Sequence, residues 1–183
     1  SMGLLLLACT AMETDRFDQP ISSDSAEAAA HYRDALDFLF CMRSAARASI
    51  DEALERDPEF ALAHCVAARV SLIEGDSRAA REAAEKGVAL AAGCSRRERQ
   101  HAELVARVTR NETQGALAMV REHATSYPRD ALPLSFALGV YGLIGFGGFV
   151  DQHQQQAAFL ESVAPAWPDD WWMQSWLGWS YVE

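Results

Sequence analysis

Lysine is nearly absent from this sequence: Lys86 is the only one, and the other fifteen basic residues are arginines. No basic residue lies beyond Arg129, and 26 acidic residues give the chain a formal net charge of −10. A general nucleic-acid binder needs a basic face to neutralise phosphates. The charge balance therefore argues against nucleic acid as a partner.

Valine and isoleucine are also scarce, and no stretch alternates between apolar and polar residues over a strand-like length. Alanine, in contrast, occurs 33 times. Alanine is the best helix former and is poor in strands. The composition thus predicts an all-α protein, and 183 residues fit one domain with a substantial core.

Cysteine is too sparse for a disulfide framework, since the four cysteines stand at positions 9, 41, 65 and 94. No pair has the C-x-x-C spacing of a zinc site. We interpret them as free thiols in a reducing cytosol, which predicts a cytoplasmic protein without a metal or other cofactor.

A signal peptide is not well supported by the first residues. Gly3–Cys9 ends like a lipoprotein cleavage box, and Ser1 before Met2 resembles a cloning scar. No basic residue precedes this run, and its apolar part is shorter than the roughly 7–15 residues of a signal core. Residues 1–21 are interpreted as an apolar lead-in strand or helix that packs on the body, with a lipoprotein signal remnant as the alternative.

Residues 131–150 carry no charge and are long enough to span a bilayer. They include Pro133 and five glycines, and no basic residue follows them to set a membrane orientation. We therefore expect a buried helix and no membrane association. Gly139, Gly142 and Gly145 recur every three residues, which predicts a small-residue stripe facing a neighbouring helix.

Helix start and stop signals divide the rest of the chain into short segments. Ser, Asp or Pro opens most of them, and Gly, Asn or Pro ends them. Nine helices joined by short turns are predicted, in the ranges 22–40, 43–57, 58–75, 76–93, 95–111, 112–128, 130–146, 149–165 and 169–183. Short connections favour antiparallel packing of successive helices.

The junction "ALERDPEFALAH" (53–64) contains Ala-Leu-x-x-Asp-Pro, and the helix pairs around it repeat. A unit of about 34 residues then runs from Ala61 to Cys94, with small residues where two helices cross closely. Those small residues are Ala68, Ala80 and Gly87. In this pattern the chain resembles tetratricopeptide repeat proteins.

More narrowly, four stretches resemble the amino-terminal part of tetratricopeptide repeat protein 38-like proteins: "DPEFALAH", "SRRERQH", "YPRDAL" and "PAWPDDWW". The resemblance implies a right-handed α-solenoid over residues 22–183, made of four helical hairpins and one unpaired helix. It implies a helical scaffold and little chemistry.

All five tryptophans lie in the last seventeen residues, and Leu177-Gly178-x-x-Tyr181 matches the core of a first repeat helix. A helix with aromatic residues around most of its circumference is not expected to face solvent alone. We expect an interface to a missing repeat or to a second copy of the chain, a homodimer, made by Trp171, Trp172, Trp176, Trp179 and Tyr181.

The concave face of such a solenoid is expected to bind a protein or peptide partner. Its inner positions hold Leu62, Cys65, Arg69, Leu72, Glu98, His101, Val105 and Val108. The alternative is that these residues pack on the chain's own N-terminal segment or later helices.

The leading hypothesis is a non-catalytic interaction scaffold. Two rivals remain: a small-molecule binder or thiol-dependent enzyme with a pocket of Cys65, Arg69 and His101, and self-assembly through the C-terminal end. Glu98-x-x-His101 has no second copy, so a di-iron site is not expected.

Overall fold

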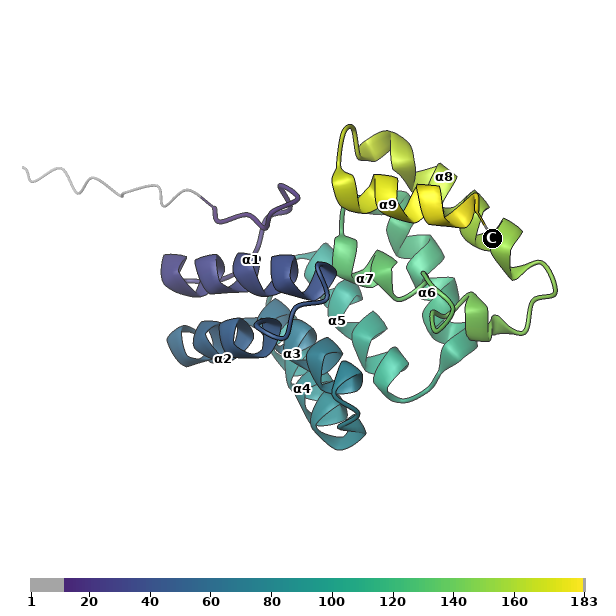
Figure 1. The fold of residues 1–183 in the computed structure, drawn as a ribbon. Helices are drawn as coiled ribbons and strands as arrows, with labels where there is room; N and C mark the ends of the chain where they lie inside the picture. Colours follow the sequence, from purple (N-terminus) through teal and green to yellow (C-terminus); the bar gives the residue numbers. More distant parts are fainter. Residues whose placement is uncertain (1–11, 183) are drawn as a thin grey trace, which may run out of the picture.

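The computed structural model describes residues 12–182, which form nine α-helices and no β-strand (Figure 1). This confirms the all-α class. The helices are α1 (Ala26–Phe40), α2 (Ala46–Arg56), α3 (Ala61–Ile73), α4 (Ser77–Ala91), α5 (Arg96–Thr109), α6 (Thr113–Ser126), α7 (Ala131–Ser135), α8 (Gln152–Val163) and α9 (Trp171–Ser180).

Side-chain caps begin several helices where the sequence predicts them. Ser25 accepts a hydrogen bond from Ala28 N at the start of α1, and Asp76 accepts one from Ala79 N at the start of α4. Ser95 and Glu98 form a capping box on α5, which satisfies backbone donors at both positions. These caps fix where the helices start and keep the connecting turns short.

Helices pack mainly on their neighbours in sequence, α1 on α2, α3 on α4, α5 on α6 and α8 on α9. Successive pairs also contact one another, since α2 packs on α3, α4 on α5 and α3 on α5 (Figure 1). Neighbour-by-neighbour packing of this kind is what a helical repeat requires.

The α3–α4 crossing is the closest fit to the repeat pattern. A Cβ atom on Gly87 would lie 3.2 Å from Cys65 Sγ and 3.3 Å from the Ala61 carbonyl oxygen. Ala68 and Ala80 are fully buried beside this crossing. Small residues are therefore needed here because the two helices leave no room for a larger side chain.

The seventh helix is much shorter than expected, and the predicted small-residue stripe is wrong. α7 ends at Ser135, and Gly139 has φ +81°, a left-handed conformation that ends helical structure. The chain then folds back, so that Leu143 N donates to Phe136 O at 2.8 Å. A Cβ at Gly142 would lie 2.3 Å from Leu138 O, so this glycine serves a tight turn.

Residues 12–24, here called the N-terminal segment, run from an isolated antiparallel bridge between Thr14 and Pro20 into the start of α1. Phe17 and Ile21 are buried in the same core as the helices. Gly3–Cys9 lies outside the described residues. Within residues 12–182, no helix has the length and apolar character needed to cross a membrane.

Candidate functional site

The structure buries most of the residues expected to line a concave groove. Leu62, Cys65, Glu98, His101 and Val105 are between 0% and 1% exposed. Arg69, Leu72 and Val108 are half-buried. The five buried side chains therefore do not line an open groove.

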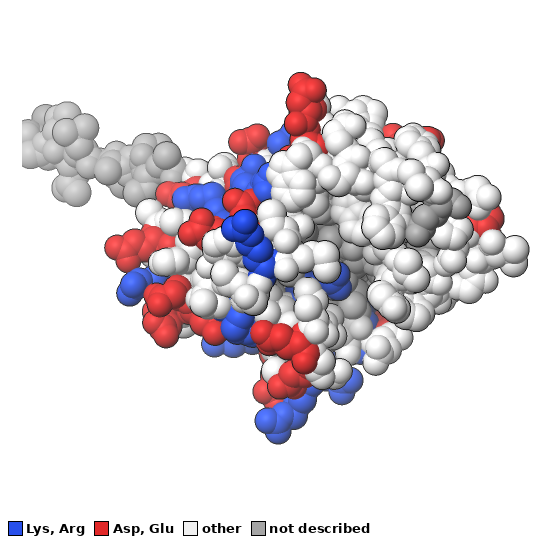
Figure 2. Space-filling model, in the orientation of Figure 1, with Lys and Arg blue, Asp and Glu red and all other residues white. Residues whose placement is uncertain are grey.

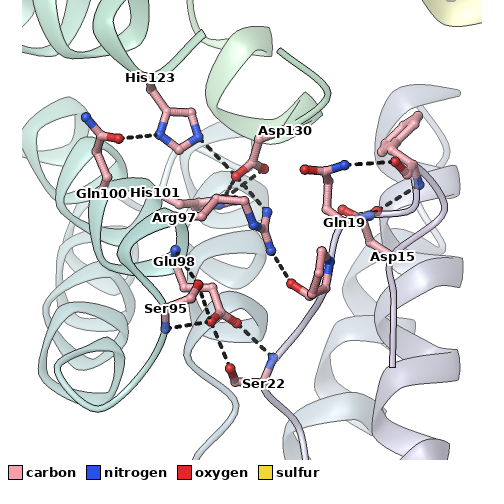
Figure 3. A network of polar contacts seen from close by, with 12 residues as sticks. Asp15, Gln19, Ser22, Ser95, Arg97, Glu98, Gln100, His101, His123 and Asp130 are labelled. Carbon is pink, nitrogen blue, oxygen red and sulfur yellow. Dashed lines mark hydrogen bonds and ion pairs between the residues drawn. The ribbon is translucent and has the colours of Figure 1, made fainter. Parts of the chain in front are cut away.

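The N-terminal segment covers part of this face. Ser22 donates to the Glu98 carboxylate twice, from its backbone N–H and from Oγ, each at 2.8 Å (Figure 3). Arg97, the residue before Glu98, donates to the Pro20 carbonyl oxygen at 2.5 Å. Of the two alternatives, packing on the chain's own N-terminal segment is the one found for Glu98.

Asp130 is the centre of a buried polar network that joins α5, α6 and the N-terminal segment (Figure 3). Its carboxylate contacts Arg97 at 2.7 Å, His101 Nδ1 at 3.1 Å and His123 Nε2 at 3.0 Å. His123 Nδ1 contacts Gln100 Oε1 at 3.0 Å. Arg97, Gln100 and His101 lie on α5, His123 lies on α6 and Asp130 precedes α7, so the network joins three successive helices.

Charges in this network depend strongly on burial. Burial alone would raise the pKa of Asp130, but the nearby His101, His123 and Arg97 hold it well below its usual range. Burial lowers the pKa of His101, against the opposing effect of Asp130. The ion pair at the centre is therefore Arg97 with Asp130.

The hydrogen bonds of His101 indicate the neutral form. Its Nδ1 faces Asp130, whereas Nε2 has no hydrogen-bond partner among the described residues. A protonated Nε2 would leave a buried N–H without an acceptor, which is costly. His101 is thus best described as neutral, with its proton on Nδ1.

A thiol nucleophile at Cys65 is not favoured by its surroundings. Burial raises the pKa of the Cys65 thiol, and the negative charges of Asp130 and Glu98 raise it further. No hydrogen bond joins Cys65 to His101 within residues 12–182. The Cys65/His101 pair is therefore not formed. Because the protonated thiol is a poor nucleophile, the raised pKa also disfavours Cys65 as a nucleophile.

Arg69 differs from Arg97 because no carboxylate among the described residues pairs with its guanidinium. Its guanidinium lies 4.6 Å from the centroid of the Phe136 ring, but it has no ion pair or hydrogen bond within the described part of the chain. Burial lowers its pKa to about 10. Stacking on an aromatic ring offsets part of this cost.

Each of the two histidines has a ring nitrogen within hydrogen-bond distance of the Asp130 carboxylate. Among residues 12–182, no group of three or more His, Cys, Asp or Glu side chains is placed to hold a metal ion. Arg97, His101, His123 and Asp130 are at most 5% exposed, and this buried centre fixes α5 and the start of α7 against the N-terminal segment.

The tryptophans divide into two groups. Trp167 and Trp172 are 1% and 3% exposed, and they pack with Phe17 and Phe40 in an aromatic cluster. Trp172 is therefore not at the surface, contrary to the expectation of an interface. The Trp172 side chain is covered by Phe17 of the N-terminal segment and Phe40 of α1, both remote from it in sequence.

The other aromatic residues contribute to an exposed region, here called the C-terminal apolar surface. It comprises Val140, Tyr141, Phe146, Val150, Trp171, Trp179, Tyr181 and Val182. These are eight of the eleven exposed large apolar residues among those described. This half of the molecule, on the right in Figure 2, shows few charged atoms.

The loop after α7 and helix α9 adjoin within this surface. The rings of Tyr141 and Phe146 are tilted against each other with centroids 6.2 Å apart, and those of Trp176 and Trp179 are tilted with centroids 6.5 Å apart. A Cβ at Gly139 would lie 3.2 Å from the Trp176 ring, so the loop after α7 and helix α9 are in contact at this point. Trp176 itself is half-buried at the junction.

A separate groove of about 700 Å³ lies between α6 and α8. Its walls are largely small or apolar, including Ala124, Ala158 and Phe159. Arg121 at its edge donates to Gln155 Oε1 at 2.8 Å. This volume falls in the range of ligand pockets, and its polar lining consists of Arg121, Thr125, Gln155 and Ser162.

Sequence reasoning did not find Asp130, Arg129 or Phe17 as site residues. The one local signal was "YPRDAL" (127–132), where two charged residues interrupt an apolar junction just before a helix. Arg129 donates to the carbonyl oxygens of Phe17 at 3.0 Å and Ala166 at 2.9 Å, contacts that no local pattern indicates.

Comparison with known proteins adds no further constraint: no family model matches the chain, and neither a curated protein nor a solved structure matches it significantly.

Proposed function

We propose that this chain is a non-catalytic α-solenoid of the tetratricopeptide type that binds a protein partner through the C-terminal apolar surface. The observation that carries the proposal is the concentration of exposed large apolar residues between positions 140 and 182. Contiguous apolar patches larger than roughly a few hundred Å² are rare on monomeric proteins and mark interaction sites.

The charge around this surface determines the kind of partner. Acidic residues Asp151, Glu161, Asp169 and Asp170 lie in the same part of the chain, where no basic residue follows Arg129. Arg16 adds one positive charge at the edge, 5.4 Å from the Trp171 ring centroid and 3.8 Å from Asp170. A partner with an apolar helix face and basic flanks complements both features. A second copy is less suitable, since it would bring two acidic edges together.

The interior supports a non-catalytic role. Arg97, His101 and His123 are buried and contact the Asp130 carboxylate, so these side chains hold helices in place. Cys41, Cys65 and Cys94 are free thiols, which fits the reducing cytosol that we propose as its location.

Peptide binding tests this proposal directly. An amphipathic helical peptide of leucine and lysine should bind the wild-type chain, whereas a matched peptide of leucine and glutamate should bind at least about tenfold more weakly. The double variant Tyr141→Ser/Trp179→Ser should lose this binding. Ile73→Ser, which removes an exposed apolar residue from α3, is the control and should retain it.

Both serine substitutions leave the net charge unchanged, so unspecific attraction of a basic peptide to an acidic protein would survive them. Equal binding by the double variant and the wild type would refute the proposed surface. Light scattering at two protein concentrations tests the second-copy alternative. If the wild type forms a dimer and Trp179→Ser dissociates it, the surface is a homodimer interface and not a site for another protein.

A further inference from the structure

The helical body binds the main chain of the N-terminal segment at four places. Three arginines donate to its carbonyl oxygens: Arg33 to Thr14 at 2.8 Å, Arg129 to Phe17 at 3.0 Å and Arg97 to Pro20 at 2.5 Å. The fourth contact is the Glu98 carboxylate, which accepts from Ser22 N and Oγ. Main-chain hydrogen bonds of this kind hold peptides in recognition grooves.

One side chain of the segment fills a dedicated pocket. The Phe17 ring centroid lies 5.0 Å from that of Trp167, 5.9 Å from Phe40 and 6.4 Å from Trp172, and the residue is 1% exposed. Ile21, four positions later, is also buried. A deep aromatic anchor surrounded by main-chain contacts is the usual arrangement of a binding hot spot.

The groups that contact the segment are held by other parts of the body. Asp130 fixes Arg97, and the Ser95 capping box fixes Glu98. Trp167 Nε1 donates to the Pro128 carbonyl oxygen at 2.6 Å, and Arg129 bonds to Ala166 O. The site is therefore preorganised, and a preorganised site loses less entropy when it binds.

Two further side-chain contacts hold the segment: Arg16 pairs with Asp37 at 2.5 Å, and Ser23 Oγ donates to Asp57 at 2.7 Å. The other polar contacts are weak or unfavourable. The ion pairs of Arg33 with Glu13 and of Arg129 with Asp18 involve substantially exposed side chains, which contribute little. Asp15 is buried, and burial raises its pKa to about 6, so its charge works against docking at neutral pH. The segment is therefore held by Phe17, by its main-chain hydrogen bonds and by the contacts of Arg16 and Ser23.

We propose that this cleft is a peptide-binding site, occupied here by the chain's own N-terminal segment, and that it accepts in trans a peptide of the same kind. The peptide has the form Asp-x-Phe-x-x-Pro-Ile-Ser, as in residues 15–22. Phe fills the aromatic pocket, Asp folds the turn by accepting from two backbone N–H groups, and Ser binds Glu98. This site is distinct from the C-terminal apolar surface.

Fluorescence anisotropy with a labelled peptide of residues 12–24 tests the proposal on the full chain. The wild type should bind it weakly, because its own segment competes at an effective concentration of about millimolar. Phe17→Ala in the chain weakens that competitor, so this variant should bind the labelled peptide at least about tenfold more tightly. A peptide with Phe17→Ala should not bind either protein.

Two further variants locate the binding site. Arg33→Met, made in the Phe17→Ala chain, should weaken peptide binding several-fold, since it removes the contact with Thr14. Arg47→Met, which breaks an ion pair with Glu74 elsewhere, should not change it. The Tyr141→Ser/Trp179→Ser chain should bind the peptide as the wild type does, which separates this site from the apolar surface.

Equal affinity of the peptide for wild type and Phe17→Ala, or no binding to a Phe17→Ala chain that retains its helical circular dichroism, would overturn the proposal. Should Phe17→Ala fail to fold, Ser22→Ala replaces it, because this variant loses only the Oγ bond to Glu98. A gain in peptide affinity is again the supporting result, and no gain the contrary one.

Discussion

Arg97 and Asp130 form an ion pair at 2.7 Å in the interior, where their side chains are 6% and 3% exposed. The pair joins the first turn of α5 to the residue that precedes α7. It also connects outward, since Arg97 holds Pro20 and Asp130 holds two histidines. One buried charge pair thereby ties the N-terminal segment to the middle of the fold.

Removing one partner of this pair should be strongly destabilising. Asp130→Asn leaves Arg97 buried without a counter-charge, so we expect the free energy of unfolding to fall by about 3–5 kcal/mol. Urea denaturation followed by circular dichroism measures it. Asp18→Asn, which breaks the exposed ion pair with Arg129, is the control and should change stability by less than about 1 kcal/mol. Similar losses in both variants would contradict a special role for the buried pair.

Much of the helical framework could be predicted from the sequence because its signals are local. Ser25, Asp76 and Ser95 stand just before helices that begin where they predict, and Gly75 has the positive φ expected after α3. The predicted length of α7, residues 130–146, is too great. An uncharged run with Pro133 and several glycines fits either a buried helix or a compact buried loop. Composition does not distinguish these two.

The candidate site was less accessible to sequence reasoning because its contacts are long-range. Ser22 and Glu98 are 76 positions apart, and Phe17 and Arg129 are 112 apart. Of the inner-face positions expected on α3 and α5, Glu98 is the one that takes part in either of these two contacts. Which segment covers this face depends on tertiary packing, and neither periodicity nor motif spacing contains that information.

Asp15 should make the stability depend on pH in an unusual direction. Its pKa in the folded chain is about 6, above the unfolded value of about 3.9. The folded state then binds the proton more tightly, so the stability contributed by this group is complete below about pH 4 and is lost as pH rises through 6. Nearby Asp130 acts in the same direction and Arg97 in the opposite one.

Asp15→Asn isolates this effect, because its amide oxygen can still accept from Phe17 N and Gln19 N. The variant should be more stable than the wild type at pH 7, with the difference shrinking towards pH 4. Asp15→Ala, which loses both hydrogen bonds, should be the less stable variant at pH 7. Denaturant midpoints at pH 4, 5, 6 and 7 provide the measurement, and an Asp15→Asn chain less stable than wild type at pH 7 would contradict the assignment.

Two glycines within helices should respond in opposite ways to substitution. Gly87→Val places a branched side chain against Cys65 and the Ala61 carbonyl, so we expect a loss of about 2 kcal/mol or more. Gly178 in α9 has open space around its Cβ position, and Gly178→Ala should stabilise the chain by about 0.5–1 kcal/mol through helix propensity. Thermal denaturation distinguishes the two. A stable Gly87→Val chain would mean that α3 and α4 are not as close as described.

The two groups of tryptophans should differ in their contribution to stability. Trp172 packs its ring on Phe40 at 5.0 Å and on Trp167 at 5.3 Å, so Trp172→Ala should lower the free energy of unfolding by about 3–5 kcal/mol. Trp179 is 51% exposed, and Trp179→Ala should change it by less than about 1 kcal/mol. Urea denaturation provides both values, and tryptophan emission of the folded proteins gives an independent check.

Emission should shift to longer wavelength in Trp172→Ala, which loses a buried fluorophore, and to shorter wavelength in Trp179→Ala, which loses an exposed one. Equal destabilisation by both substitutions would mean that the α9 surface is covered, and the partner site would then have to lie elsewhere.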